Sequence, residues 1–478
     1  MAIAASDLQP KARSGSSRVT KCERRGDRLY PPRFLPPKAP PRGLDYIGKL
    51  IKDPLLALPS AAYEEPIVVR NSPVRMVSAC APEMVRTVLV DRRRDFDRKP
   101  AVQSYLLGRL LGNGILLAEG ADWRWQRQIA APLFRHSEIL GYVPIMSEAA
   151  SAALRAWRAD SAGVHDIAAD MTRATYDVIA HTILVGGSEK ITEATERQRH
   201  RYAAALRWAT IYGLLNLPAW LPRPGRRFMN ARDDRLRQIT EEMIVARSME
   251  EDAGDDLLAR LLRARRADSG EAMTREQLID NLLTFLLAGH HTTSAALTWT
   301  LYLLACAPEW QERLKDEVRE VVPEGPVSAA HIDRLVLVQQ VLKESMRLFP
   351  PVPFVARIAT CDTELGGQKI AAGTLISIPI YAVHRHRSTW ADPHRFDPTH
   401  FAGDKEPSVA SCKFLPFGAG PRVCIGSAFA LIEATVFLAT LLRAAHFELP
   451  APDFLPIPAS GVLLTPKHGM PLKITVRG

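Results

Sequence analysis

A long apolar stretch between Thr274 and Ala307 constrains the fold of this chain more than any other feature. Thr274 and Gln277 have the spacing of a capping box, so we expect a helix to begin there and to continue to Ala307, just before Pro308. At about 1.5 Å per residue this helix is about 50 Å long, enough to cross a whole domain. Two adjacent histidines and two threonines at its centre would be costly in lipid. The sequence therefore predicts a buried core helix rather than a membrane span.

The rest of the chain reads as mostly helical, with a small share of strands. Helical periodicity dominates to about residue 348, and includes helices opening at Pro308 and running over about residues 335–348. Strands are expected at residues 67–70 and 75–78, as a hairpin, and between residues 363 and 380. A last helix is expected from about residue 425 to residue 445. With no repeat and no convincing linker after residue 45, we expect a mostly α, α+β fold in one large domain over residues 45–478.

Residues 1–44 form a basic, proline-rich segment that we expect to be partly disordered. No apolar segment lies at the N-terminus, so we expect neither a signal peptide nor a stable membrane anchor. The six cysteines have no CxxC or framework spacing, which indicates a reducing compartment, the cytoplasm. The net charge of +10 is that of a basic soluble protein, because no Lys/Arg-rich run stands apart, and we expect no nucleic-acid partner.

A glycine-rich segment over residues 417–426, FGAGPRVCIG, is the most informative part of the chain. We expect it to bring Cys424 to the first turn of the next helix, where unpaired N–H groups and the positive helix end favour a thiolate. Gly418 and Gly420 permit tight turns and let a flat ligand approach the backbone. Arg422 can reach an anionic group of that ligand, and Gly426 leaves room behind the sulfur. For a lone cysteine, a structural role would be the simpler interpretation.

The whole string resembles the haem-binding signature of the cytochrome P450 superfamily, F-G-x-G-x-R-x-C-x-G, with every fixed position filled. The resemblance extends over roughly residues 45–475 and implies a helix-rich part and a small β-rich part with a haem b between them. It implies that Cys424 is the ligand of the haem iron, where a thiolate favours cleavage of the O–O bond. Phe417, Arg422 and Gly426 then belong to the haem-binding loop.

A second motif of this family, E-x-x-R, is matched by Glu344 and Arg347, which share a helix face. Such pairs are usually solvated at a surface, but here the resemblance implies a structural pair behind the haem. The family's third member is an arginine in a P-E-R-F-like segment, and this chain has His400 instead. Its imidazole can still donate a hydrogen bond to Glu344.

The residues expected to bind the haem acids lie in two other segments. Trp123 and Arg127 match the W-x-x-x-R helix of the family, and Arg357 matches a further propionate-binding arginine. Arginine suits these acids because the guanidinium group is planar and always charged. An ordinary basic amphipathic helix is the alternative for Trp123 and Arg127.

The oxygen side of the haem is expected on the long helix, at residues 288–293, AGHHTT, which match the family pattern A/G-G-x-D/E-T-T/S. The resemblance places Ala288 and Gly289 over the haem, with Gly289 leaving room for dioxygen, and gives Thr292 the task of holding a proton donor. His291 stands where the family has an acid, and an imidazole can also relay protons. Either His291 or its neighbour His290 could instead be a hydrogen-bonded core residue.

The resemblance implies a haem-dependent monooxygenase of soluble bacterial type, which inserts one atom of O2 into a small-to-medium hydrophobic substrate. Electrons would pass from NAD(P)H through a separate ferredoxin or flavodoxin and its reductase, because the chain has no flavin or nicotinamide motif. A basic face near Arg124 and Lys413 would suit an acidic carrier. Core packing explains the apolar residues expected in the pocket equally well; they are Leu106, Ile115, Leu116, Phe285, Phe354 and Val355.

Two other functions stay open on the sequence alone. One is a haem-thiolate enzyme of different chemistry, such as a peroxygenase, an isomerase or a dehydratase. The other is a non-catalytic haem protein that senses or stores a ligand.

Overall fold

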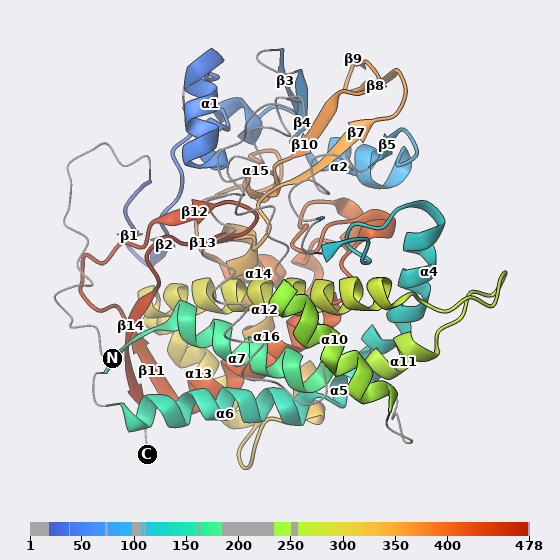
Figure 1. The fold of residues 1–478 in the computed structure, drawn as a ribbon. Coiled ribbons are helices and arrows are strands. Elements are labelled where there is room, and N and C mark those ends of the chain that lie inside the picture. The colour runs from blue at the N-terminus through green and yellow to red at the C-terminus, as the bar shows by residue number, and fades with distance from the viewer. Residues whose placement is uncertain are drawn as a thin grey trace.

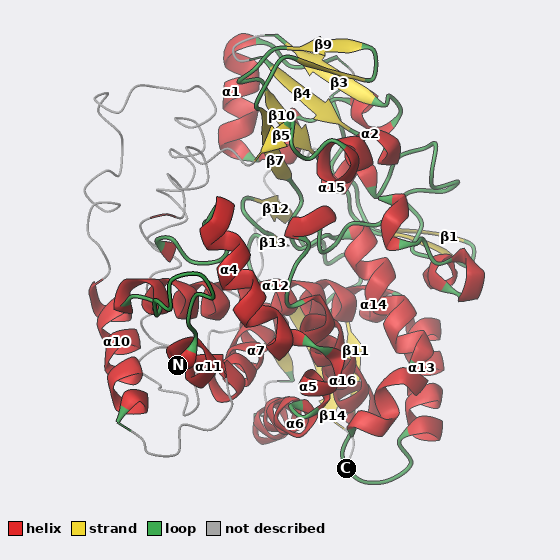
Figure 2. Ribbon diagram, turned by 90° about the vertical axis from the view of Figure 1, so that its right-hand side faces the viewer, coloured by secondary structure: helices red, strands yellow, loops and turns green. Residues whose placement is uncertain are grey.

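Helix α12 (Arg275–Cys306) crosses the middle of the molecule, with helices packed around it and a β-rich part to one side, as the computed structural model shows (Figure 1). The structure describes residues 19–37, 39–71, 75–97, 108, 111–160, 163–183, 234–249 and 257–476. A view turned by 90° shows the same division, with strands β3, β4, β7 and β10 together at one end and α6, α7, α12 and α16 at the other (Figure 2). The fold is mostly helical α+β, as the sequence predicts.

The ends of α12 are set by local chemistry. The Gln277 N–H donates to the Thr274 hydroxyl at 3.2 Å, and the Thr274 N–H donates to the Gln277 side-chain oxygen at 3.0 Å. This capping box satisfies two N–H groups that the first turn leaves unpaired. At the other end Pro308 opens α13 (Pro308–Val321). The predicted start and end of this helix are therefore confirmed.

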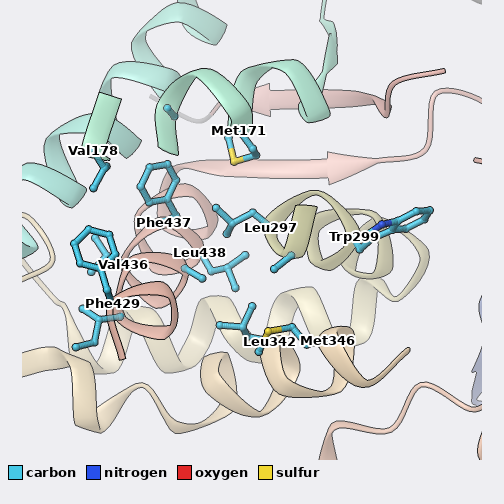
Figure 3. Packing of buried hydrophobic residues seen from close by; sticks show 14 of the residues in the cluster. Met171, Val178, Leu297, Trp299, Leu342, Met346, Phe429, Val436, Phe437 and Leu438 are labelled. Atoms are coloured by element: carbon cyan, nitrogen blue, oxygen red, sulfur yellow. The ribbon is translucent and has the colours of Figure 1, made fainter. Parts of the chain in front are cut away.

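Most of the apolar core is built around α12. It packs against α7 (Ile167–Ile183), α14 (Val336–Leu348) and α16 (Ser427–Ala444). Figure 3 shows side chains from all four helices meeting in one cluster, with Leu297 of α12 at its centre and Trp299 of the same helix to one side. Trp299 stacks on Phe349, with ring centroids 4.1 Å apart and planes within 3°. A helix that is apolar on all sides is expected inside such a core.

Among the described residues, α16 has the length and mean hydropathy, 1.6, of a membrane-spanning helix, and 67% of it is buried inside the protein. A helix buried at the centre of a large soluble core can have the same length and composition as a membrane-spanning helix.

Five strands form the main sheet, in the order β3 (Ile67–Arg70), β4 (Met76–Ala79), β10 (Leu375–Ile378), β7 (Val355–Ala359) and β5 (Phe96–Asp97). Strands β4 and β10 are parallel, and the other neighbours are antiparallel. The predicted hairpin is confirmed as β3 and β4, with Ile67 opposite Ala79, although its turn lies outside the described residues.

Smaller sheets hold the remaining strands. One has three strands, in the order β11 (Ala445–Glu448), β14 (Pro471–Val476) and β6 (Val164–Asp166). The two-stranded sheets pair β1 (Glu23–Arg25) with β2 (Arg28–Tyr30), β8 (Thr363–Leu365) with β9 (Gln368–Ile370), and β12 (Pro458–Ser460) with β13 (Leu464–Pro466). The other helices are α1 (Gly43–Lys52), α2 (Pro82–Arg86), α4 (Gly120–Ala130), α5 (His136–Leu140), α6 (Val143–Ala159), α10 (Asp234–Ser248), α11 (Leu257–Arg263) and α15 (Ile380–Val383).

The segment before α1 contributes to the core in its described part. Leu29 and Phe34 are buried, and Phe34 meets the ring of Tyr381 edge-on at 5.9 Å. Residues 1–18 of this segment lie outside the described residues.

Candidate active site

The cysteine loop is shaped by two glycines in the left-handed region. Gly418 and Gly420 have φ of +74° and +72°, which other residues rarely adopt. A Cβ on Gly420 would lie 2.1 Å from the carbonyl oxygen of Leu89, so the close approach here is to backbone of the same chain. The Cys424 N–H then donates to the Phe417 carbonyl at 2.9 Å and closes the loop. Tight turns at both glycines are thus confirmed.

Cys424 comes two residues before the N-cap of α16, Gly426, rather than in its first turn as we predicted. Its side chain is exposed, yet it lies deep enough in the protein that burial raises the pKa of the thiol. The Gly426 N–H and the charge of Arg127 act in the opposite direction and favour the thiolate. A side chain that is exposed deep inside a protein lines an internal space.

A short stretch of exposed and half-buried residues lies in the middle of α12. Residues 278–286 and 293–306 of this helix are all buried, whereas Ala288 is exposed and Leu287, His291 and Thr292 are half-buried. One turn of a core helix therefore faces a space that no described side chain fills. This is the turn on which the sequence places the oxygen side of the haem.

A cationic cluster lies beside Cys424. Two guanidinium groups lie over the ring of Trp123 on α4, that of Arg422 at 4.0 Å and that of Arg127 at 5.9 Å from the ring centroid. Arg127 also donates to the Val423 carbonyl at 2.9 Å, and Arg422 donates to the Ala118 carbonyl at 2.8 Å. These contacts attach α4 to the cysteine loop, and they bring together three of the residues predicted to hold the haem acids.

The fourth, Arg357, is half-buried on β7 and donates to the Ala356 carbonyl at 2.8 Å. The resemblance places this arginine beside the haem.

The residues described so far fit a haem. The group is flat, largely apolar and doubly acidic, so it needs an internal space, a sulfur facing that space and cations at one edge. Cys424, the opened turn of α12 and the arginine cluster provide these three features. Burial also disfavours the thiolate form of Cys424, and the positive charge of a haem iron would stabilise that form.

On the oxygen side, the Thr292 hydroxyl donates to the Ala288 carbonyl at 2.9 Å, one turn back. Gly289 packs closely against α7. A Cβ there would lie 2.8 Å from Cδ1 of Ile179 on α7, so the missing side chain lets α7 pack closely on α12. That Gly289 also leaves room for dioxygen stays a prediction.

The two adjacent histidines differ sharply. His290 is 1% exposed, its Nδ1 lies 2.6 Å from the Leu286 carbonyl, and burial lowers its pKa to about 4. It also meets the ring of Tyr176 edge-on at 5.4 Å. His290 is therefore a neutral core residue. His291 is half-buried on the opened turn, with its ring centroid 3.8 Å from that of His290.

Behind the cysteine loop, Glu344 and Arg347 form the ion pair expected from their spacing. The Arg347 Nε and Nη2 donate to the two Glu344 oxygens at 2.7 and 2.8 Å. Its remaining N–H groups donate to the carbonyls of His384, Pro393 and Arg395 at 2.8–3.0 Å, so all five donors are used. His400 contributes as expected, with its Nδ1 3.4 Å from Glu344 Oε2.

His384 is a positioning residue that sequence reasoning missed. Its Nε2 accepts a hydrogen bond of 2.6 Å from the Leu415 N–H, at the start of the cysteine loop. Complete burial lowers the pKa of His384 to about 3, so the ring is neutral and can accept. Since Arg347 holds the His384 carbonyl, the buried ion pair is linked to the loop that carries Cys424.

Glu433, in the middle of α16, was also missed. It is completely buried, and neither carboxyl oxygen has a hydrogen-bond partner within the described residues. Burial raises its pKa to about 8, and the nearby side chain of Thr293 opposes this shift. Thr293 donates to the Gly289 carbonyl at 3.2 Å instead. The available signal was an acid within an otherwise apolar helical run, nine residues after Cys424.

The residues predicted to line the substrate pocket differ in how deeply they are buried. Ile115 and Phe285 are core residues, 7% and 6% exposed, and Phe285 stacks on Phe134 at 5.7 Å. Leu116, Phe354 and Val355 are half-buried. Leu106 lies outside the described residues.

The loop that carries Ile115 is held on α12. The N–H groups of Asn113 and Ile115 donate to the side chains of Asp280 and Asn281 at 2.8 and 3.0 Å.

Comparison with known proteins agrees with this geometry. A family model described as Cytochrome P450 matches residues 60–473. The chain is 33% identical to a cyclooctat-9-en-7-ol 5-monooxygenase from Streptomyces melanosporofaciens, over 81% of this chain and 83% of that protein. It is 32% identical to a cytokinin hydroxylase from Arabidopsis thaliana, over 89% and 84%. The crystal structure of the cytochrome P450DA haem domain superposes with a TM-score of 0.80 at 25% identity, covering 93% of this chain and 97% of that one.

Proposed function

Because the chain belongs to the cytochrome P450 family and is a monooxygenase, we propose that it inserts one atom of dioxygen into a small-to-medium hydrophobic substrate, by hydroxylation or epoxidation. The observation that carries this proposal is the opened turn of α12. Leu287 and Ala288 present apolar surface there beside Thr292. An apolar space favours an apolar substrate, because binding removes apolar surface from water.

Haem b, bound through the Cys424 thiolate, supplies the activation of dioxygen. Arg127 and Arg422 would pair with its acids, since both guanidinium groups already lie together beside the cysteine loop. Trp123 keeps the two groups in place between α4 and the loop. Arg357 would add a third cation from β7.

Thr292 and His291 are proposed to deliver protons on the oxygen side. The Thr292 hydroxyl gives its proton to the Ala288 carbonyl and so keeps its lone pairs for a water or another proton donor. A neutral imidazole has one donor and one acceptor nitrogen, so His291 can receive a proton at one and release it at the other.

Electrons are proposed to come from NAD(P)H through a separate ferredoxin or flavodoxin and its reductase. Arg124 and Lys413 are exposed, and Arg127 and Arg422 are half-buried. Their positive charges would attract an acidic carrier.

We also propose that the enzyme is cytoplasmic and of the soluble bacterial type. Support comes from the free state of its six cysteines and from its Streptomyces relatives. Plant proteins match at similar identity, so the class is tested by fractionating cells that express the full chain. Recovery in the membrane pellet would contradict it.

The test of the whole proposal begins with the haem. The reduced carbon-monoxide complex of the wild-type protein should absorb at the red-shifted thiolate position, and Cys424→Ser should lose that band. Ferric protein is then titrated against a library of apolar compounds, and compounds that shift the spectrum are incubated with reduced nicotinamide, a surrogate ferredoxin and its reductase under labelled dioxygen. One labelled oxygen atom per product molecule is the expected result.

Three results would contradict the proposal. Retention of the thiolate band by Cys424→Ser would exclude Cys424 as the ligand. Turnover with peroxide alone, or without any reductant, would indicate a different haem-thiolate reaction. Spectral shifts without turnover of any ligand would indicate a sensor.

A further inference from the structure

The segment before α1 is attached to the C-terminal end of α12 by Arg24. Its Nη2 and Nε donate to the Cys306 carbonyl at 2.9 and 3.3 Å, and Nη2 also pairs with Glu309 Oε2 at 2.7 Å. Cys306 is the last residue of α12, whose final carbonyls have no partner within the helix. The arginine therefore fixes the approach of strand β1 to this helix end.

The same attachment brings two cysteines together. Side chains two residues apart lie on the same side of an extended chain, so Cys22 points toward α12 as Arg24 does. Cys22 is half-buried against the core cluster that contains Cys306, and each thiol lies close enough to the other to shift its pKa. Cys306 itself is 8% exposed.

The two sulfurs differ in their readiness to react. The Cys306 thiol and the nearby charge of Arg24 lower the pKa of Cys22. The Cys22 thiol, together with burial, raises the pKa of Cys306. A thiolate is the nucleophile in thiol oxidation. Cys22 is therefore the attacking sulfur, and Cys306 is a neutral thiol in contact with it.

We propose that Cys22 and Cys306 form a reversible disulfide, with hydrogen peroxide as the oxidant. The Cys22 thiolate attacks one peroxide oxygen, the O–O bond breaks, and the second oxygen leaves as water after taking a proton. The Cys306 sulfur then attacks the resulting sulfenic acid, forms the S–S bond and releases a second water. Two thiols are oxidised to one disulfide while one peroxide is reduced to two waters, and a dithiol reductant reverses the change.

The surroundings of Cys80, Cys412 and Cys361 differ from those of this pair. Burial raises the pKa of Cys80 to about 12 and also raises the pKa of Cys412, so both are slow to react. Cys361 is exposed and belongs to neither core cluster, so it serves as the surface control. Dioxygen is the co-substrate of this enzyme, and its two-electron reduction yields hydrogen peroxide, so the oxidant can arise at the enzyme itself.

The disulfide would join the segment before α1 to the end of the central helix, across most of the chain. A cross-link that closes so long a loop removes entropy from the unfolded state. We therefore expect the oxidised holoenzyme to melt several degrees higher than the reduced one, and dithiothreitol to reverse the shift.

The test treats reduced holoenzyme with a small excess of hydrogen peroxide, stops the reaction with catalase, alkylates the remaining thiols and maps the peptides by mass spectrometry. The haem absorbance is followed to show that the protein stays intact. The expected product is one linked peptide that joins Cys22 to Cys306 and weighs about 2 Da less than the sum of the two reduced peptides.

Two variants separate the roles of the sulfurs. In Cys306→Ser, oxidation should stop at the Cys22 sulfenic acid, which dimedone captures. In Cys22→Ser, Cys306 should stay reduced under the same treatment. The matched control, Cys361→Ser, should form the linked peptide at the wild-type rate.

The proposal is overturned if intact wild-type holoenzyme gives no linked peptide. It is also overturned if Cys361 is oxidised first, or if Cys306 oxidises equally fast in Cys22→Ser.

Discussion

Arg347 holds Glu344 through two hydrogen bonds of 2.7 and 2.8 Å, and both side chains are completely shielded from solvent. The same guanidinium group binds the carbonyl of His384, whose ring accepts the Leu415 N–H at the start of the cysteine loop. The pair therefore does more than neutralise a buried charge. It fixes the position of the loop that presents Cys424.

Arg347→Ala is expected to give poorly folded, haem-deficient protein. The change leaves the Glu344 carboxylate buried without its main partner, which costs about 3–5 kcal/mol of the free energy of unfolding. Haem content per chain and the melting temperature measure the effect. The matched control is Arg319→Ala, which breaks an exposed pair with Asp316 at the same spacing and should change neither quantity much. A well-folded, haem-replete Arg347→Ala with an altered product pattern would contradict the structural role.

Gly289→Ala is expected to destabilise the protein through α7 rather than to block oxygen access. The added Cβ would lie 2.8 Å from Cδ1 of Ile179, so that side chain must move, at a cost of about 1–3 kcal/mol. Ile179→Val removes the clashing methyl group, and the double variant should recover part of the lost stability. If Gly289→Ala folds as well as wild type but loses turnover, room for dioxygen is the better explanation.

Replacing His291 tests whether it relays protons as the family's acid does. His291→Asp or His291→Glu should keep activity or improve coupling, because a carboxylate exchanges protons by rotation. His291→Ala should slow turnover and raise peroxide release by a factor on the order of ten or more, as expected for the loss of a general acid. Thr292→Ala should also release peroxide. Product formed per reduced nicotinamide consumed is the measurement, with peroxide assayed in parallel.

If His291→Ala couples as well as wild type, the histidine is a packing residue and protons follow another route. Glu433 is then the first residue to test, because it is a buried acid close to Thr293.

Glu433 should make the protein less stable as the pH rises from about 4.5 to about 8. Burial raises its pKa from 4.5 in the unfolded chain to about 8 in the folded one, so in this interval the folded state binds a proton that the unfolded state has released. Stability from this group is complete below pH 4.5 and falls by up to about 1.4 kcal/mol per pH unit above it.

Glu433→Gln should flatten this dependence, because an amide of the same shape does not titrate. Thermal melts of the two proteins between about pH 5 and pH 8 measure the difference, with Glu320→Gln as an exposed control. Equal pH slopes for wild type and Glu433→Gln would show that Glu433 does not carry the proton.

Local sequence determined the elements whose ends depend on neighbouring residues. Thr274 and Gln277 cap α12 through contacts three residues apart, and Pro308 follows at the other end. The turns at Gly418 and Gly420 are equally local, because a positive φ is a property of one residue. The spacing of Glu344 and Arg347 on one helix face likewise predicted their ion pair.

Tertiary structure alone decided which groups meet across the chain. The place of Ile179 against Gly289, the burial of Glu433 beside Thr293, the His384 link to the cysteine loop and the contact of Cys22 with Cys306 all join residues far apart in sequence. Periodicity shows that a residue faces the core, but it does not show which other side chain fills the adjacent space. That depends on how the helices pack, and packing fixes both the neighbours and the charge state of each buried group.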